Sequence, residues 1–214
     1  MASDTNLPHL LPGEPYHHGD LANALRRSGA DVLAERGVAG FSLREVARRA
    51  GVSHAAPAHH FGDAQGLLTA IAVEAFQYLT KQTEAALVGI DDSVDALAKL
   101  GRAYVTVAVE YPGHCAILFR HDAVNTDDPA YREWGQRAYA VLVGAIERLA
   151  HQRAPDLDID LAAALCWSTV QGLLTVHQPL QALAHRHGRT SPPIGDLAER
   201  FIRLLVTGFE GHLR

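Results

Sequence analysis

The segment from Phe41 to Leu68, FSLREVARRAGVSHAAPAHHFGDAQGLL, constrains the fold of this chain most strongly. Four apolar residues near its start recur three and four positions apart, which places them on one face of a helix. These residues are Leu43, Val46, Ala47 and Ala50. Ser42 precedes this helix and Glu45 follows three residues later, which is the spacing of a capping box. Gly51 is placed to end the helix in the left-handed conformation.

A second short helix is expected over about residues 54–61, with Ser53 as its N-cap and Phe61 as an apolar anchor at its end. Asp63 is the expected N-cap of a third helix. Two short helices joined by a tight turn form the helix-turn-helix plan, in which the second helix enters the DNA major groove. An ordinary helical hairpin in an α-helical core has the same spacing, so the segment alone leaves both interpretations open.

The flanking sequence favours the helix-turn-helix. The stretch ADVLAERGVAGFSLREVARRAGVSHAAPAHHFGDAQGLL resembles the N-terminal domain of tetracycline-repressor-like (TetR family) transcriptional regulators, over about residues 16–70. The later segment CWSTVQGLL resembles a Trp…His-Gly signature of one subgroup, with Gln171 where that subgroup has His. The resemblance implies an all-α fold, in which a three-helix helix-turn-helix DNA-binding domain precedes a helical ligand-binding and dimerisation domain.

Composition and helix signals divide the chain into three parts. We expect a disordered arm over residues 1–15, a DNA-binding domain over 16–66, and a ligand-binding and dimerisation domain over 67–214. A first helix is expected before the helix-turn-helix, with Asp20 as its N-cap and Gly37 at its end. A long helix from Asp63 to about Gly89 should pass from the second part to the third. Later helices are expected from about Ser93 to Tyr111, over 114–122, over 128–152, over 160–184 with a kink or interruption at Pro179, and over 194–212.

The charge distribution supports a local DNA-binding surface. The whole chain carries a formal charge of -5, but residues 16–62 hold six arginines against four acidic residues. The remainder holds 13 basic and 20 acidic residues, so a slightly basic end joins an acidic body. Two cysteines do not form a disulfide framework. No signal peptide and no run of about 18 uncharged apolar residues is evident, so we expect a cytoplasmic protein.

The residues expected to contact DNA lie at the start of the first short helix and along the second. They are Ser42, Arg44, Arg48, Ser53, His54, Ala55, Ala56, His59 and His60. Alanines can contact thymine methyl groups, and histidines can bond base edges. The family usually has Tyr at the position of Ala58 and Lys at that of Ala64, both of which contact phosphate. Their absence predicts weaker phosphate binding unless the arginines, the histidines or the N-terminal arm compensate.

The predicted effector site is a set of mostly aromatic residues in the C-terminal part. Its members are Tyr104, Cys115, Phe119, Trp134, Trp167 and His177. By the resemblance, they would bind a small apolar or aromatic molecule, although each residue is equally explained as ordinary core. The 13 histidines form no His-Glu-x-x-His motif, and there is no paired Cys-x-x-Cys. We therefore expect no metal site, no catalytic residues and no cofactor.

The sequence thus predicts a ligand-responsive transcriptional repressor that is not an enzyme. As the resemblance implies, it would bind a palindromic double-stranded DNA operator as a homodimer formed by the last two helices. Effector binding would change the spacing of the two recognition helices. The alternative is a helical ligand-binding or interaction protein on the same scaffold, with weakened or lost DNA binding. Ala58 and Ala64 are the residues that favour this alternative.

Overall fold

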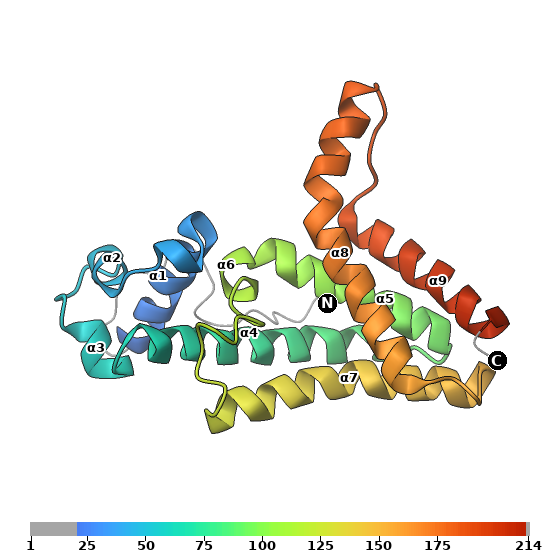
Figure 1. The fold of residues 1–214 in the computed structure, drawn as a ribbon, viewed down its shortest axis with the longest axis horizontal. Helices are drawn as coiled ribbons and strands as arrows, with labels where there is room; N and C mark the ends of the chain where they lie inside the picture. Colours follow the sequence, from blue (N-terminus) through green and yellow to red (C-terminus); the bar gives the residue numbers. More distant parts are fainter. Residues whose placement is uncertain (1–20, 213–214) are drawn as a thin grey trace. The chain divides into compact units, whose positions relative to one another are not determined.

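The computed structural model describes residues 21–212, and the side chains of residues 21–208. Over this range the chain forms nine α-helices and one short 3-10 helix and contains no strand (Figure 1), so the all-α prediction is confirmed. The elements are α1 (Leu21–Arg36), η1 (Val38–Gly40), α2 (Leu43–Arg49), α3 (Ala56–Phe61), α4 (Ala64–Ala86), α5 (Ser93–Glu110), α6 (Pro112–Cys115), α7 (Pro129–Arg153), α8 (Ile159–Arg186) and α9 (Ile194–His212). The predicted arm over 1–15 and the predicted cap at Asp20 lie outside the described residues.

The chain divides into two compact units. Unit 1 takes the chain to Tyr78 and adds Tyr111–Gly135, whereas unit 2 consists of Leu79–Glu110 and the chain from Gln136 onward. Both α4 and α7 therefore begin in unit 1 and end in unit 2. This packing division differs from the boundary expected near residue 66, because the first half of α4 packs with unit 1. The boundary of the DNA-binding domain remains a prediction.

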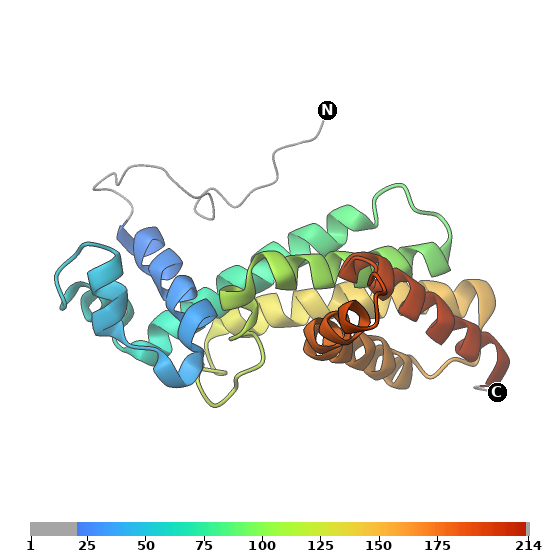
Figure 2. The ribbon, with the colours of Figure 1, turned by 90° about the horizontal axis from the view of Figure 1, so that it is seen from above.

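Glycine and aspartate residues set the helix ends of unit 1 where the sequence predicts. Gly37 has φ 64° after α1, and Gly51 has φ 69° after α2, a conformation that L side chains rarely adopt. At the start of α4, Asp63 accepts a hydrogen bond from the Gly66 backbone N–H at 2.8 Å. In Figure 2 the short segments between these helix ends leave α1, α2 and α3 grouped together.

The core of unit 1 joins α1, α2 and α4. Its largest members are fully buried leucine, isoleucine and valine side chains on the inward faces of these helices. They are Leu25, Leu33, Val46, Leu67 and Ile71. A Cβ at Gly29 would lie 2.7 Å from Ile71 Cδ1, so the missing side chain lets α1 approach α4 closely. This close-packed core holds α2 in place against α1 and α4.

Unit 2 is built around α5, which packs against both α8 and α9. Buried side chains from α5, α7, α8 and α9 form one cluster, which includes Leu97, Ile146, Leu173 and Ile202. Four ion pairs also join α5 to α9, among them Lys99 Nζ 3.0 Å from Glu199 and Arg102 2.5 Å from Asp196. These contacts hold the last helix in place.

Two N-cap predictions were wrong. Ser42 occupies the N-cap of α2, but its side chain makes no capping hydrogen bond. Glu45, the other half of the predicted capping box, pairs with arginines instead. Helix α3 begins later than predicted, with Ala55 at its N-cap, so Ser53 does not cap it.

Two proline predictions were correct only in part. The sequence correctly predicts that α5 ends before Pro112, since its last residue is Glu110. The helix predicted over 114–122 was wrong, because Pro112 opens the short α6 and turns follow Cys115. Pro is well suited to the first turn of a helix, where no backbone N–H is needed. Pro179 lies inside α8, which continues through it to Arg186. The long helix therefore accommodates the loss of one backbone hydrogen bond at this position.

Helix α8 also differs from the expectation that no segment resembles a membrane span. It is long and apolar enough to cross a membrane when judged by length and composition alone. However, its buried residues Ala162, Cys166 and Leu173 belong to the core of unit 2. Its C-terminal half projects beyond the other helices of unit 2 (Figure 1).

Candidate nucleic-acid interface

The surface formed by α2, the following turn and α3 presents most of the residues expected to contact DNA. Eight of the nine predicted residues are exposed, and Ala56 is half-buried. The chain turns between the helices at Gly51, and the Val52 backbone N–H donates to the Ala47 carbonyl at 3.0 Å. Pro57, in the first turn of α3, is the buried residue of that helix. The exposed face of α3 thus displays Ala58, His59 and His60.

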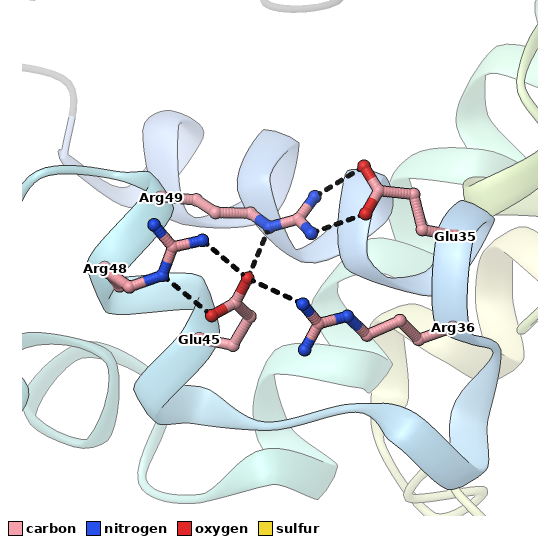
Figure 3. Close-up of polar contacts among 5 residues, drawn as sticks. All are labelled: Glu35, Arg36, Glu45, Arg48 and Arg49. Atoms are coloured by element: carbon pink, nitrogen blue, oxygen red, sulfur yellow. Dashed lines mark hydrogen bonds and ion pairs between the residues drawn. The ribbon is translucent and has the colours of Figure 1, made fainter.

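A cluster of five charged residues from α1 and α2 adjoins this surface (Figure 3). We call it the Glu45 cluster, and it consists of Glu35, Arg36, Glu45, Arg48 and Arg49. Glu45 lies 2.8 Å from Arg48, 3.0 Å from Arg49 and 3.2 Å from Arg36. Arg49 also reaches Glu35 on α1 at 2.5 Å. The cluster therefore ties α2 to the C-terminal end of α1 and carries a net charge of +1.

The arginines of this surface differ in their freedom to meet phosphate. The Arg49 side chain is 19% exposed and lies between two carboxylates, whereas the Arg48 side chain is 66% exposed and pairs with Glu45 alone. An exposed Arg can exchange a surface ion pair for phosphate at little cost, because such pairs contribute little free energy. Arg48 can therefore exchange its carboxylate partner for another anion, whereas Arg49 is held between α1 and α2.

The sequence indicated part of the Glu45 cluster. Glu45 precedes Arg48 and Arg49 by three and four residues, a spacing at which side chains meet on a helix surface. Two ion pairs of the Glu45 cluster connect α2 to α1. Arg36 and Glu45 are nine positions apart, and Glu35 and Arg49 are fourteen positions apart. No local pattern predicts those two contacts.

Glutamine in place of Glu45 should change the response of this protein to acid. The arginine hydrogen bonds lower the pKa of Glu45 from the ordinary 4.5 to about 2. A carboxylate with a lowered pKa stabilises the fold above its ordinary pKa, and that stabilisation is lost as pH falls from about 4.5 to about 2. We expect Glu45→Gln to lower the thermal midpoint at neutral pH and to flatten its decline over this acid range.

Glu147→Gln, at an exposed glutamate of α7, is the matched control for thermal unfolding from neutral pH to about pH 2. It should follow the unmodified protein closely. Equal acid dependence in Glu45→Gln and the unmodified protein would show that the Glu45 cluster does not stabilise the fold.

The residues predicted to bind an effector are divided between the two units. Cys115, Phe119 and Trp134 belong to unit 1, where the Phe119 ring packs edge-on against Phe76 at 6.1 Å. Tyr104, Trp167 and His177 belong to unit 2, where Tyr104 and Trp167 pack against the core cluster. Burial raises the pKa of the Cys115 thiol to about 12, which keeps it protonated at neutral pH. The effector site remains a prediction.

Among the described residues, no group of three or more His, Cys, Asp or Glu side chains is arranged to hold a metal ion. His59 and His60 contact each other edge-on, with ring centroids 5.6 Å apart. Because both rings are exposed on α3, they extend the polar surface of that helix.

Solved structures similar to this chain share its fold. A protein of unknown function from Rhodococcus sp. RHA1 is 28% identical, with a TM-score of 0.73, over 92% of this chain and 100% of that one. The TetR family transcriptional regulator PfmR from Thermus thermophilus is 22% identical, with a TM-score of 0.66, over 87% and 98%. The transcriptional regulator FadR from Bacillus subtilis, in complex with stearoyl-CoA, is 15% identical, with a TM-score of 0.68, over 86% and 97%.

Family models match both parts of the sequence, whereas no curated protein matches it. The model of bacterial regulatory proteins of the tetR family covers residues 25–71, which contain α2 and α3. The model of the tetracyclin repressor-like C-terminal domain covers residues 97–205. The helix-turn-helix interpretation of α2 and α3 is therefore confirmed, and the chain belongs to the TetR family of transcriptional regulators.

Proposed function

We propose that this protein is a repressor that binds a palindromic DNA operator as a homodimer and releases it when a small molecule binds. The DNA-binding part of this proposal is supported by the exposure of α3 beside the Glu45 cluster. The N-terminal residues of a recognition helix read base edges in the major groove, and nearby cations bind phosphate. In this proposal Ser53, His54, Ala55, Ala56, His59 and His60 face the bases.

Phosphate contacts in this proposal come from the start of α2. Ser42 and Arg44 are exposed there, and Arg48 is exposed one turn later. Backbone N–H groups at the start of a helix bind anions because the helix dipole is positive at that end. The combination would orient each subunit on the duplex without reading its sequence.

The apolar surface of unit 2 supports the homodimer. Four large apolar residues on α8 are exposed, as are two on α9, and these two helices pack against each other. They are Leu161, Val176, Leu180 and Leu183 on α8, with Phe201 and Leu204 on α9. We call these six residues the α8–α9 face. An apolar surface of this kind is typical of an interface, and a second copy would cover it by two-fold symmetry.

Small residues within the same region of α8 would let a partner helix approach closely. Ala164, Ser168 and Gly172 are exposed on α8 between the larger apolar residues. A Cβ at Gly172 would have no atom within 4 Å, so the space above it is open. A dimer through the last two helices therefore accounts for the apolar character of α8 in a cytoplasmic, non-enzymatic regulator.

The proposed effector is an apolar or aromatic small molecule. FadR, which has the same fold, was solved in complex with stearoyl-CoA. In this chain, Tyr104 and Trp167 border the core of unit 2. The effector must bind the DNA-free arrangement more tightly than the DNA-bound one, since differential affinity sets the coupling.

Selection of DNA sequences from random duplexes tests the proposal. The result we expect is enrichment of a palindrome whose half-sites lie one or more helical turns apart. No enriched sequence from a folded protein would favour the second candidate function, a helical ligand-binding or interaction protein that no longer binds DNA. The observation behind that candidate is that Ala58 is exposed on α3 and Ala64 opens α4 without the usual phosphate-binding side chains.

Restoring those side chains should strengthen DNA binding. The double variant Ala58→Tyr/Ala64→Lys adds two phosphate contacts per subunit, and the charged Lys contact should steepen the log–log salt dependence by about 0.9 per subunit. We expect higher operator affinity and a steeper slope in a salt titration. Ala85→Lys, which adds a Lys at an exposed position near the other end of α4, is the control for a simple gain in charge. No difference between the two variants would contradict the placement of Ala58 and Ala64 at phosphates.

A further inference from the structure

Unit 1 contains a cavity that lies outside the residues predicted for the effector. Its volume is about 560 Å³, within the range of about 300–1,000 Å³ typical of small-molecule sites. Helices α1, α3 and α4 line it together with the segment that leads into α7. The lining residues are Arg26, Phe61, Gly66, Thr69, Ala70, Val73, Glu74, Gln77, Asn125, Asp128 and Ala130.

Hydrogen bonds hold the walls of this cavity in place. Gln65 on α4 donates to the Val124 carbonyl at 3.3 Å, and the Asn125 backbone N–H donates to Thr69 Oγ1 at 2.8 Å. These two bonds attach the segment before α7 to α4. At one end, a Cβ on Gly66 would lie 2.0 Å from the Phe61 carbonyl oxygen, so α3 and α4 meet there without a gap. These contacts fix the segment before α7 and the start of α4 as walls of the cavity.

The charges around the cavity favour a cation over an anion. Glu74 is 4% exposed, and its Oε2 lies 3.3 Å from Arg26 Nε and 3.7 Å from the His114 ring nitrogen Nε2. Arg26 is therefore already engaged by the Glu74 carboxylate. Asp128 adds a second carboxylate, whose Oδ1 accepts a hydrogen bond from the Tyr131 backbone N–H at 2.9 Å. With one arginine against two carboxylates, the lining carries a formal charge of -1.

The uncharged part of the lining suits an apolar body. Phe61, Ala70, Val73 and Ala130 supply aromatic and aliphatic surface, while Gln77 supplies an amide. Pockets of this composition bind molecules whose apolar portion becomes buried and whose polar group is held by a polar side chain of the pocket. We propose that this cavity is a binding site for an organic cation, an aromatic or aliphatic amine whose ammonium group lies at Asp128.

A ligand in the cavity should change the affinity of the protein for DNA. This consequence rests on the proposed function. Phe61 is the last residue of α3, and Arg26 lies on α1, which the Glu45 cluster joins to α2. A ligand that contacts these residues changes DNA affinity if the cavity differs between the free and DNA-bound arrangements. By linkage, DNA then changes the affinity for the amine by the same factor.

Isothermal titration calorimetry with three indoles of matched shape tests the site without DNA. Tryptamine carries the cation, tryptophol is its neutral counterpart, and indole-3-acetate is an anion. We expect tryptamine to bind at least about tenfold more tightly than tryptophol, the size of one charge-assisted hydrogen bond, and indole-3-acetate to bind most weakly. Failure of operator selection would not affect this result, so the two proposals can fail separately.

Two variants, Asp128→Asn and Ala70→Phe, test whether tryptamine binds in the cavity, and Asp92→Asn is the control. Asp128→Asn removes the charge but keeps an N-cap residue of equal quality for α7, and it should weaken tryptamine binding about tenfold. Asp92→Asn makes the same change at the cap of α5, where Asp92 accepts from Val94 and Asp95, and should leave tryptamine binding unchanged. Ala70→Phe should fill the cavity and remove binding of all three indoles while thermal unfolding shows a folded protein.

Three results would overturn the proposal. One is no tryptamine binding up to about 10 mM, where even millimolar affinity is measurable. Another is equal binding of tryptamine and indole-3-acetate, which would exclude recognition by charge. The third is unchanged tryptamine binding in both Asp128→Asn and Ala70→Phe, which would place the amine elsewhere on the protein.

Discussion

A protein carrying Leu204→Glu is expected to be monomeric and to bind the proposed palindromic operator at least about 100-fold more weakly than the unmodified protein, which we propose to be a dimer. Leu204 is 72% exposed on α9, within the α8–α9 face. A carboxylate there would have to lose its hydration when a second copy covers the face, which is strongly unfavourable without a partner charge. Because linked binding of two half-sites contributes about 10²–10⁴ in affinity, separation of the subunits removes that factor.

Val88→Glu is the matched control. Val88 is 79% exposed in the turn after α4, in the same unit but outside the α8–α9 face. Sedimentation analysis should find a dimer for Val88→Glu and a monomer for Leu204→Glu, with operator affinity measured on the same samples. A dimeric Leu204→Glu protein with normal operator affinity would contradict the proposed interface.

Replacement of Gly113 by alanine should destabilise unit 1 by at least about 3 kcal/mol and lower its thermal midpoint by about 10 °C. A Cβ at Gly113 would lie 1.9 Å from the Ala30 carbonyl oxygen and 3.1 Å from the Ala34 backbone nitrogen. Both obstructing atoms belong to the backbone of α1, so no side-chain rotation relieves the clash. Helix α6 would have to move away from α1.

Gly144→Ala is the control for this prediction. Gly144 lies in α7, and a Cβ there would meet no atom within 4 Å. Alanine has a higher helix propensity than glycine by about 1 kcal/mol, so this variant should unfold at a slightly higher temperature. Circular dichroism melts of the two variants make the comparison. An unchanged midpoint in Gly113→Ala would show that α1 and α6 are not in close contact.

The helix ends show which structural features could be predicted from sequence. Gly37, Gly51 and Asp63 act within one turn of the chain, through backbone conformation or a short hydrogen bond, and each was predicted correctly. The Ser42–Glu45 capping box was wrong because arginines from two helices compete for the same carboxylate. A local motif predicts a contact well when no distant residue binds the same group more strongly.

Tertiary packing explains what the sequence did not reveal. Segment 111–135 joins unit 1 because glycine at position 113 permits close contact with Ala30, far away in the chain. The cavity beside Glu74 likewise brings together Arg26, Phe61 and Asp128, which no spacing rule connects. The face of α3 could be predicted because its residues are neighbours in sequence. The predicted effector residues are not neighbours, and the structure divides them between two units.

Binding of the selected palindrome, measured together with the mass of the complex, tests the central claim most directly. We predict a complex of two chains per duplex, with at least about 10³-fold preference over a scrambled duplex at physiological salt. Affinity should fall steeply as salt increases, because phosphate contacts release counterions. Equal affinity for the palindrome and the scrambled duplex, or one chain per duplex, would contradict the proposal of a dimeric operator-binding repressor.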